Sequence, residues 1–215
     1  MTKPFNETFA ATPQTVFETM SKLSAKYNSV NLGQGFPDEE GPETMKVIAG
    51  KSLMDNHNQY PPMLGLPELR EAVAAHSLAN QGIACDPASE VVITSGATEG
   101  IAACMLGLLN PGDEVIILDP CYDSYVGMAL RAGGVVKPLR LRSDDMSIPL
   151  DDLENAFGPK TKLIMFNSPH NPSGKVFSNE EMQAIARLCI QHDVIAVCDE
   201  VGPHSETELV SKALI

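Results

Sequence analysis

Four short segments of polar and small residues each follow an apolar run that is typical of a buried strand. In parallel α/β sheets ligands bind at the carboxyl ends of the strands, so we expect chemistry at these segments. Together they offer a helix start that can bind an anion, an aromatic ring, an amide and a carboxylate. The segments read Ser95-Gly96-Ala97-Thr98, Asp119-Pro120-Cys121-Tyr122, Asn171-Pro172-Ser173-Gly174 and Cys198-Asp199-Glu200.

The segment around Gly96 leads from an apolar run into an expected helix. Free N–H groups at a helix start, together with the helix dipole, form an anion site, and Gly96 lets the backbone approach a ligand closely. The alternative is a plain tight turn with Thr98 near the helix cap, and the segment alone does not decide between the two. It matches neither a Walker loop nor a GxGxxG fingerprint, and Gly33-Gln34-Gly35 carries only half of the latter.

Tyr122 and Asn171 each permit two interpretations. An aromatic ring just beyond a strand end can stack on a flat heterocycle, although packing on the core is the commoner role of such a ring. Asn171 can donate a hydrogen bond to a phenolic oxygen, but the pair Asn-Pro also opens many turns.

Asp199 is the most informative single residue, because it ends an almost wholly apolar strand. A carboxylate at such a place is costly unless it is paired. A protonated ring nitrogen is a suitable partner, and a helix cap or a salt bridge to a nearby Arg or Lys is the alternative. A phosphate turn, an aromatic ring, an amide and a carboxylate at successive strand ends are what a phosphorylated pyridine requires.

The elements that position these residues alternate between helices and short apolar strands. This alternation predicts an α/β fold with a mostly parallel sheet that is flanked by helices on both faces. A loop is expected over the Gly- and Pro-rich residues 33–45. Strands are expected over 91–94, 115–118, 135–141, 163–166 and 194–197, and helices near 16–23 and over 67–81, 97–109, 122–132, 150–157 and 178–192, the last opened by a capping box.

The composition excludes several classes of partner. Acidic residues outnumber basic ones 28 to 15, and the net charge of −13 disfavours nucleic acid and anionic membranes. No run of 18 apolar residues exists, so no membrane span is expected. The five cysteines form no CxxC pair, which favours free thiols in a reducing compartment over a metal or disulfide framework. With Glu7 and Glu18 in an N-terminus that has no apolar core, a cytoplasmic location is expected.

Five ordered motifs cover nearly the whole chain. On these motifs residues 1 to about 201 resemble the class I/II aminotransferases of fold type I, which use pyridoxal 5′-phosphate, and within them the kynurenine and methionine aminotransferase group. The motifs are Asn31-Leu32-Gly33-Gln34-Gly35-Phe36-Pro37, Asn58-Gln59-Tyr60 with Gly65-Leu66-Pro67-Glu68-Leu69-Arg70, Thr94-Ser95-Gly96-Ala97-Thr98-Glu99, Asn167 through Gly174, and Cys198-Asp199-Glu200-Val201.

The resemblance implies a role for each matching residue at the cofactor ring and phosphate. Ala97 and Thr98 would bind the phosphate through backbone N–H groups, and Tyr122 would stack on the pyridine ring. Asn171 would hydrogen-bond the 3-oxygen of the ring. Asp199 would pair with the pyridinium nitrogen and keep it protonated, so that the ring withdraws electrons from the substrate.

The resemblance also implies a homodimer that moves an amino group between an amino acid and a 2-oxo acid. Tyr60 would reach the phosphate of the other subunit, and Gly35 would lie beside the substrate carboxylate. The amino donor would be kynurenine, methionine, or an aromatic or glutamine-like amino acid, and no metal is expected. Residues 1–40 would form an N-terminal arm and substrate-side loop, and residues 41–201 part of the cofactor-binding large domain.

The tail over 202–215 departs from the family. Gly202 stands where a tyrosine is expected, and the Schiff-base lysine and the arginine that grips the substrate carboxylate should come later than the chain extends. Lys212 follows Asp199 by only 13 residues and is not expected to replace that lysine. We therefore expect a chain that is inactive alone, or a non-catalytic truncated isoform that binds full-length subunits. The abrupt change at Gly202 suggests a shifted reading frame, a retained intron or a gene-model error.

A nucleotide-binding domain is a further alternative, which the incomplete GxGxxG and the pair of Asn171 and Asp199 disfavour. For the sheet, the resemblance implies that strand 135–141 lies at one edge, followed by 115–118, 163–166 and 194–197. Strand 91–94 would lie at the far edge. Two strands encoded after residue 201 would lie in the sheet between strand 194–197 and strand 91–94. The sheet is therefore expected to be incomplete at its C-terminal side.

Overall fold

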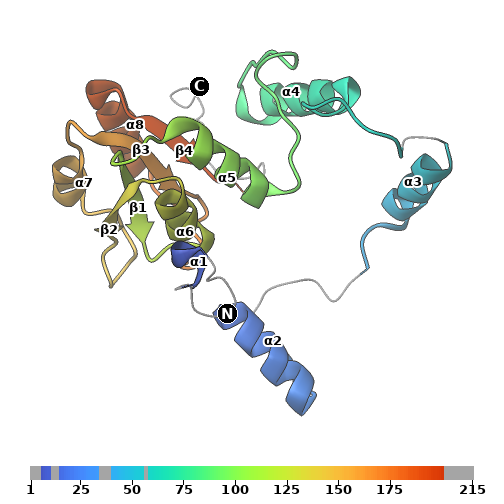
Figure 1. The fold of residues 1–215 in the computed structure, drawn as a ribbon, viewed down its shortest axis with the longest axis horizontal. Helices are drawn as coiled ribbons and strands as arrows, with labels where there is room; N and C mark the ends of the chain where they lie inside the picture. Colours follow the sequence, from blue (N-terminus) through green and yellow to red (C-terminus); the bar gives the residue numbers. More distant parts are fainter. Residues whose placement is uncertain (1–5, 11–14, 34–39, 56–57, 201–215) are drawn as a thin grey trace. The chain divides into compact units, whose positions relative to one another are not determined.

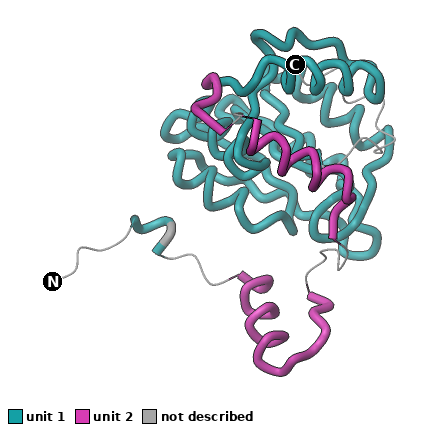
Figure 2. Tube along the Cα trace, turned by 90° about the vertical axis from the view of Figure 1, so that its right-hand side faces the viewer, with its two compact units in different colours: residues 1–10, 64–215 teal, residues 11–63 magenta. Residues whose placement is uncertain are grey.

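The computed structural model describes residues 6–10, 15–33, 40–55 and 58–200 (Figure 1). The chain falls into two compact units: residues 1–10 and 64–215 form the first, and residues 11–63 form the second (Figure 2). The boundaries predicted at residues 40 and 201 belong to a different division, based on the family, and they stay predictions.

The first unit is built on a parallel sheet of four strands in the order β2-β1-β3-β4. This is the order that the resemblance implies for these four strands, so that prediction is confirmed. β1 is central, and its residues from Val115 to Leu118 are fully buried. The strands are β1 (Glu114–Asp119), β2 (Val135–Arg140), β3 (Thr161–Phe166) and β4 (Ile195–Cys198).

Helices cover both faces of the sheet, as the alternation in the sequence predicts (Figure 1). Side chains alternate along a strand, so Ile116 of β1 packs with α7 (Leu150–Ala156) and α8 (Asn179–His192). Ile117 packs on the other face, in the cluster that α5 (Ala97–Leu108) and α6 (Ser124–Arg131) form. The fold class, α/β with a parallel sheet between helices, is therefore confirmed.

Local sequence signals fix the ends of two helices. Ser178 accepts a hydrogen bond from the backbone N of Glu181, and the Glu181 side chain accepts one from the backbone N of Ser178, which is the predicted capping box. α4 (Pro67–Gln81) begins at a proline and ends at Gly82, whose left-handed φ of 70° suits glycine.

The strand predicted over 91–94 does not form. The backbone N of Ile93 donates to the carbonyl of Leu64 at 3.0 Å, and Val92 is 57% exposed. A strand needs a hydrogen-bonded neighbour along its length, and within the described part of the chain no strand lies beside this segment. The prediction is wrong because an apolar run indicates burial but not the presence of a pairing partner.

The second unit contains α2 (Val16–Tyr27) and α3 (Glu43–Met54), neither of which has a buried residue. α2 is the short helix that the sequence predicts, and Thr15 caps it by accepting a hydrogen bond from the N of Glu18. The loop predicted over 33–45 is wrong at its end, since α3 begins directly after Pro42, whose fixed φ suits a helix start. No helix in the described residues is long and apolar enough to span a bilayer.

Candidate functional site

Asp199 directly follows β4, and its carboxylate accepts a hydrogen bond from a tyrosine hydroxyl. The Tyr125 Oη donates to Asp199 Oδ2 at 2.7 Å, and the backbone N of Asp199 donates to the carbonyl of Phe166 at 3.0 Å. Within the described residues no Arg, Lys or His forms an ion pair with Asp199, so the salt bridge considered from the sequence is not made. The partly buried carboxylate has a neutral hydrogen-bond partner and no cation beside it among the described residues, which favours a cationic ligand.

Tyr125 is a buried residue of α6 that is only 1% exposed. Burial, and next the hydrogen bond to Asp199, raise the pKa of Tyr125 far above its ordinary value. The phenol therefore stays protonated at neutral pH and remains a hydrogen-bond donor to the carboxylate.

Tyr122 contacts the same tyrosine. The ring centroids of Tyr122 and Tyr125 lie 5.6 Å apart at an angle of 70°, which is the edge-to-face arrangement that aromatic pairs prefer. Tyr122 packs at the margin of the α5–α6 cluster and stays partly exposed. It thus has core contacts and also remains accessible, one ring away from Asp199.

The start of α5 has backbone donors that no side chain caps. Gly96 precedes the helix with a φ of 79°, and neither Thr98 nor another side chain caps the first turn. Ala97 and Thr98 are exposed, and their N–H groups have no acceptor within the helix, because they belong to its first turn. The Glu99 carboxylate accepts a hydrogen bond from the backbone N of Ser95. The cap role that the sequence left open for Thr98 is not observed.

The loop after β3 is held by His170. The backbone N of His170 donates to the carbonyl of Lys175, and its own carbonyl accepts from the N of Gly174, each at 2.7 Å. The His170 ring is 2% exposed, and its Nδ1 lies 2.7 Å from Ser173 Oγ. Asn171, at the tip of this loop, is exposed, and its amide has no hydrogen bond within the described residues. It therefore does not cap the turn.

Burial lowers the pKa of His170, and the nearby Pro120 carbonyl opposes this only in part. The Nε2 of the buried ring has no hydrogen-bond partner among the described residues. His170 is therefore neutral at pH 7, and its one ring hydrogen bond among the described residues is to Ser173 of the same loop.

The roles of two predicted site residues stay predictions. Tyr60 lies in the second unit and is 99% exposed. Gly35 lies outside the described residues. The sequence analysis also misses Tyr125 and His170, and the nearness of Tyr125 to Tyr122, three residues earlier, is the signal from which Tyr125 could be found.

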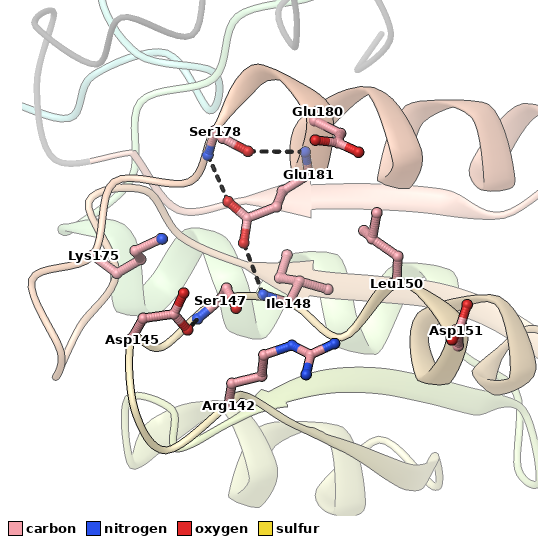
Figure 3. Close-up of a pocket in the computed structure, with 10 residues that line it drawn as sticks. All are labelled: Arg142, Asp145, Ser147, Ile148, Leu150, Asp151, Lys175, Ser178, Glu180 and Glu181. Carbon is pink, nitrogen blue, oxygen red and sulfur yellow. Dashed lines mark hydrogen bonds between the residues drawn. The ribbon is translucent and has the colours of Figure 1, made fainter.

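A cavity of about 420 Å³ lies elsewhere, at the N-terminus of α8 (Figure 3). Glu181 lines it, and its two carboxylate oxygens accept hydrogen bonds from the backbone N of Ser178 and of Ile148, each at 2.7 Å. None of the site residues predicted from the sequence lines this cavity. Its buried carboxylate serves to join the segment before α7 to α8.

All five cysteines are free. Burial raises the pKa of the Cys189 thiol to about 12 and raises that of Cys198 further, so neither is a nucleophile at neutral pH.

Comparison with known proteins places these features in one family. A family model described as aminotransferase class I and II matches residues 27–207. The probable N-succinyldiaminopimelate aminotransferase DapC of Mycobacterium tuberculosis is 43% identical over 192 residues, which cover 88% of this chain and 48% of the relative. The methionine aminotransferase of Escherichia coli is 35% identical over 190 residues, 88% of this chain and 49% of the relative.

The kynurenine–oxoglutarate transaminase 3 of Rattus norvegicus is 40% identical over 199 residues, 87% of this chain and 44% of the relative. The solved structure of N-succinyldiaminopimelate aminotransferase from Mycobacterium tuberculosis superimposes with a TM-score of 0.87 at 40% identity, over 91% of this chain and 52% of that one. The chain thus spans about half the length of the curated relatives it matches.

Proposed function

The chain belongs to the class I and II aminotransferases, and we propose that it forms the cofactor-binding part of an enzyme that moves an amino group between an amino acid and a 2-oxo acid. The observation that carries this proposal is the carboxylate of Asp199. It lies at the end of β4 with a neutral hydrogen-bond partner and no cation among the described residues. A ligand with a protonated ring nitrogen supplies the missing positive charge.

The donors and acceptors at the strand ends fit pyridoxal 5′-phosphate. The uncapped N–H groups of Ala97 and Thr98 would hold its phosphate. Tyr122 would stack on its ring, the free amide of Asn171 would donate to the ring oxygen, and Asp199 would accept from the ring nitrogen. When it is bound, the cofactor supplies an electron-withdrawing ring that accepts electron density from the α-carbon of the substrate.

The chain's own residues would act on the cofactor by orientation and charge. Asp199 would keep a proton on the ring nitrogen, and Tyr122 would hold the plane of the ring against α6. In a homodimer, Tyr60 would donate to the phosphate held by the partner subunit, and Gly35 would make room for the substrate carboxylate. These last two roles rest on the resemblance of the motifs around them.

The amino donor stays open within a small set. The relatives named for methionine, kynurenine and N-succinyldiaminopimelate support these three compounds as candidates, with aromatic and glutamine-like amino acids beside them. For a polypeptide of these 215 residues alone, we propose no turnover with any of them, because the lysine that family members use for proton transfer has no counterpart in its motif context. Such a polypeptide would instead bind to full-length subunits.

A titration tests the proposal and its nucleotide-binding alternative. Pyridoxal 5′-phosphate should bind the chain, Asp199→Asn should weaken that binding, and Asp152→Asn, at an exposed carboxylate of α7, should not. NAD should not bind, since the nitrogen of its nicotinamide ring carries a ribose and has no hydrogen to donate to Asp199. Equal binding of the cofactor to the wild type and D199N chains would show that the carboxylate does not contact the ring.

A further inference from the structure

Tyr125 contacts two of the three side chains that the proposed site places on the cofactor ring. Its hydroxyl donates to Asp199 Oδ2 at 2.7 Å, and its ring meets the Tyr122 ring edge to face at 5.6 Å. Within the described residues, this is the one hydrogen bond that the Asp199 side chain makes. The other carboxylate oxygen, Oδ1, is left for a ligand.

We propose that Tyr125 is a positioning residue, whose hydroxyl fixes the Asp199 carboxylate so that Oδ1 meets the protonated ring nitrogen of the cofactor. The inference rests on the proposed function, because it concerns the same ring nitrogen. Tyr125 itself touches the cofactor at no point in this proposal. It acts through Asp199. Tyr125 belongs to α6 and Asp199 directly follows β4, and the fold brings the two residues together although they lie 74 positions apart in the sequence.

A neutral donor suits this task better than a cation. An arginine or lysine beside Asp199 would hold the carboxylate equally well but would also neutralise it, and it would then compete with the ring nitrogen. The Tyr125 phenol orients the carboxylate and leaves its charge. Burial and the carboxylate itself raise the pKa of Tyr125, so the hydroxyl does not become a second anion in the site.

The packing around Tyr125 makes its hydroxyl a fixed point. The ring is 1% exposed and lies in the cluster that includes Ile101 of α5, Met165 of β3 and Val197 of β4. Phenylalanine would fill the same space and keep the edge contact with Tyr122, but it donates no hydrogen bond. Tyr125→Phe therefore separates the packing role of the ring from the orienting role of the hydroxyl.

The test uses the full chain and two probes that differ only at the ring nitrogen. The probes are pyridoxamine 5′-phosphate and its 1-deaza analogue, in which a C–H group replaces that nitrogen, and calorimetry measures the affinity of each. The wild-type chain should prefer the nitrogen-containing probe by roughly tenfold or more, as a hydrogen bond to a charged group supplies. Tyr125→Phe should reduce this preference by about three- to tenfold and leave the affinity for the deaza probe unchanged.

Two further variants separate the failure of this inference from the failure of the proposed function. Asp199→Asn should abolish the preference, and Tyr27→Phe, which removes the hydroxyl of an exposed tyrosine of α2, should leave it intact. If Y125F weakens both probes equally, Tyr125 is only structural and the inference is overturned alone. If D199N keeps the preference, or if neither probe binds the wild-type chain, the proposed function is overturned as well.

A measurement on the unsubstituted chain guards against a Y125F protein that does not fold. In a chain labelled with ¹³C at the tyrosine Cζ atoms, the resonance of Tyr125 should shift when pyridoxamine 5′-phosphate binds. The 1-deaza probe should leave that resonance unshifted, because its C–H group cannot donate a hydrogen bond to the Asp199 carboxylate. Equal shifts with both probes, or none with either bound probe, would overturn the inference.

Discussion

Among isosteric substitutions in α8, the replacement of Glu181 with glutamine should destabilise the chain the most. Glu181 is 6% exposed, and its two oxygens accept hydrogen bonds from the backbone N of Ser178 and of Ile148, each at 2.7 Å. The residue thereby begins the helix that leads into β4 and so to Asp199. It also ties that helix to the segment that follows β2.

The magnitude follows from the two opposed donors. Glutamine has the same length, but its single amide oxygen can accept from only one of them, and its NH₂ group then faces the other N–H. The change removes one hydrogen bond to a charged group and leaves a buried donor without an acceptor, which together cost about 2–4 kcal/mol. Against a total stability of about 5–15 kcal/mol for an ordinary domain, this loss is large.

Urea unfolding followed by circular dichroism measures the effect, with Glu180→Gln as the matched control. Glu180 is the neighbouring residue in the same helical turn, but it is exposed, so both variants lose the same charge near the start of α8 and only one loses buried hydrogen bonds. The midpoint of E181Q should fall well below that of E180Q. A difference between the two variants of less than about 0.5 kcal/mol would refute the assigned role of Glu181.

Three further predictions address the site, the sheet edge and the response to pH. Joining residues 1–201 to the C-terminal half of the Mycobacterium tuberculosis relative should give a transaminase, in which Asp199→Ala lowers kcat about 10²-fold or more, as the removal of a preorganised charge does; a small loss would contradict the role of Asp199. Among the described residues β4 pairs only with β3, so Ile195→Lys should reduce self-association in light scattering, whereas Ile190→Lys, at an exposed position of α8, should not. Because burial lowers the pKa of His170, the chain should lose stability as the pH falls below about 6.5, and His170→Asn should flatten that dependence in thermal melts at pH 5 to 8.

The sequence predicts those parts of the fold whose causes are local. The capping box at Ser178 and the glycine end at Gly82 each need only a few neighbouring residues, and both appear where expected. The apolar runs of β1, β3 and β4 are likewise long enough to indicate burial, whereas β2 carries Lys137 and Arg140 and is mostly exposed or half-buried. The run over 91–94 has the same signal, yet whether it pairs depends on strands elsewhere, which no local pattern reveals.

α3 is missed for a different reason. Its apolar residues lie around the whole helix, as Met45, Val47 and Ile48 do, so no single face marks it, and the preceding glycines and prolines suggest a loop. At such a segment neither the spacing of apolar residues nor the glycines and prolines indicate the helix.

At the site, residue type and position predict which groups lie at the strand ends but not what each one contacts. Asp199 is conspicuous because a carboxylate ends an apolar strand, and this alone leaves a salt bridge, a cap and a ligand open. Among the described residues the structure shows no salt bridge to Asp199. Its side-chain partner is Tyr125, which lies 74 positions earlier in the chain. A contact of that separation arises from the fold, because α6 packs on the face of the sheet where Val197 of β4 joins the same apolar cluster.

The separation of buried central residues from polar residues at the strand ends explains how the fold holds a carboxylate without a cationic partner among the described residues. The central residues of β1 and β3 are buried between two apolar clusters, and these supply the stability of the unit. Polar residues follow these buried runs at the carboxyl ends of the two strands, and Asp199, at the end of β4, is only partly buried, so the core is not interrupted. Asp199 is held there by one backbone hydrogen bond to Phe166 and one side-chain hydrogen bond from Tyr125. Its orientation is thus set by the core, while its charge remains available to a ligand.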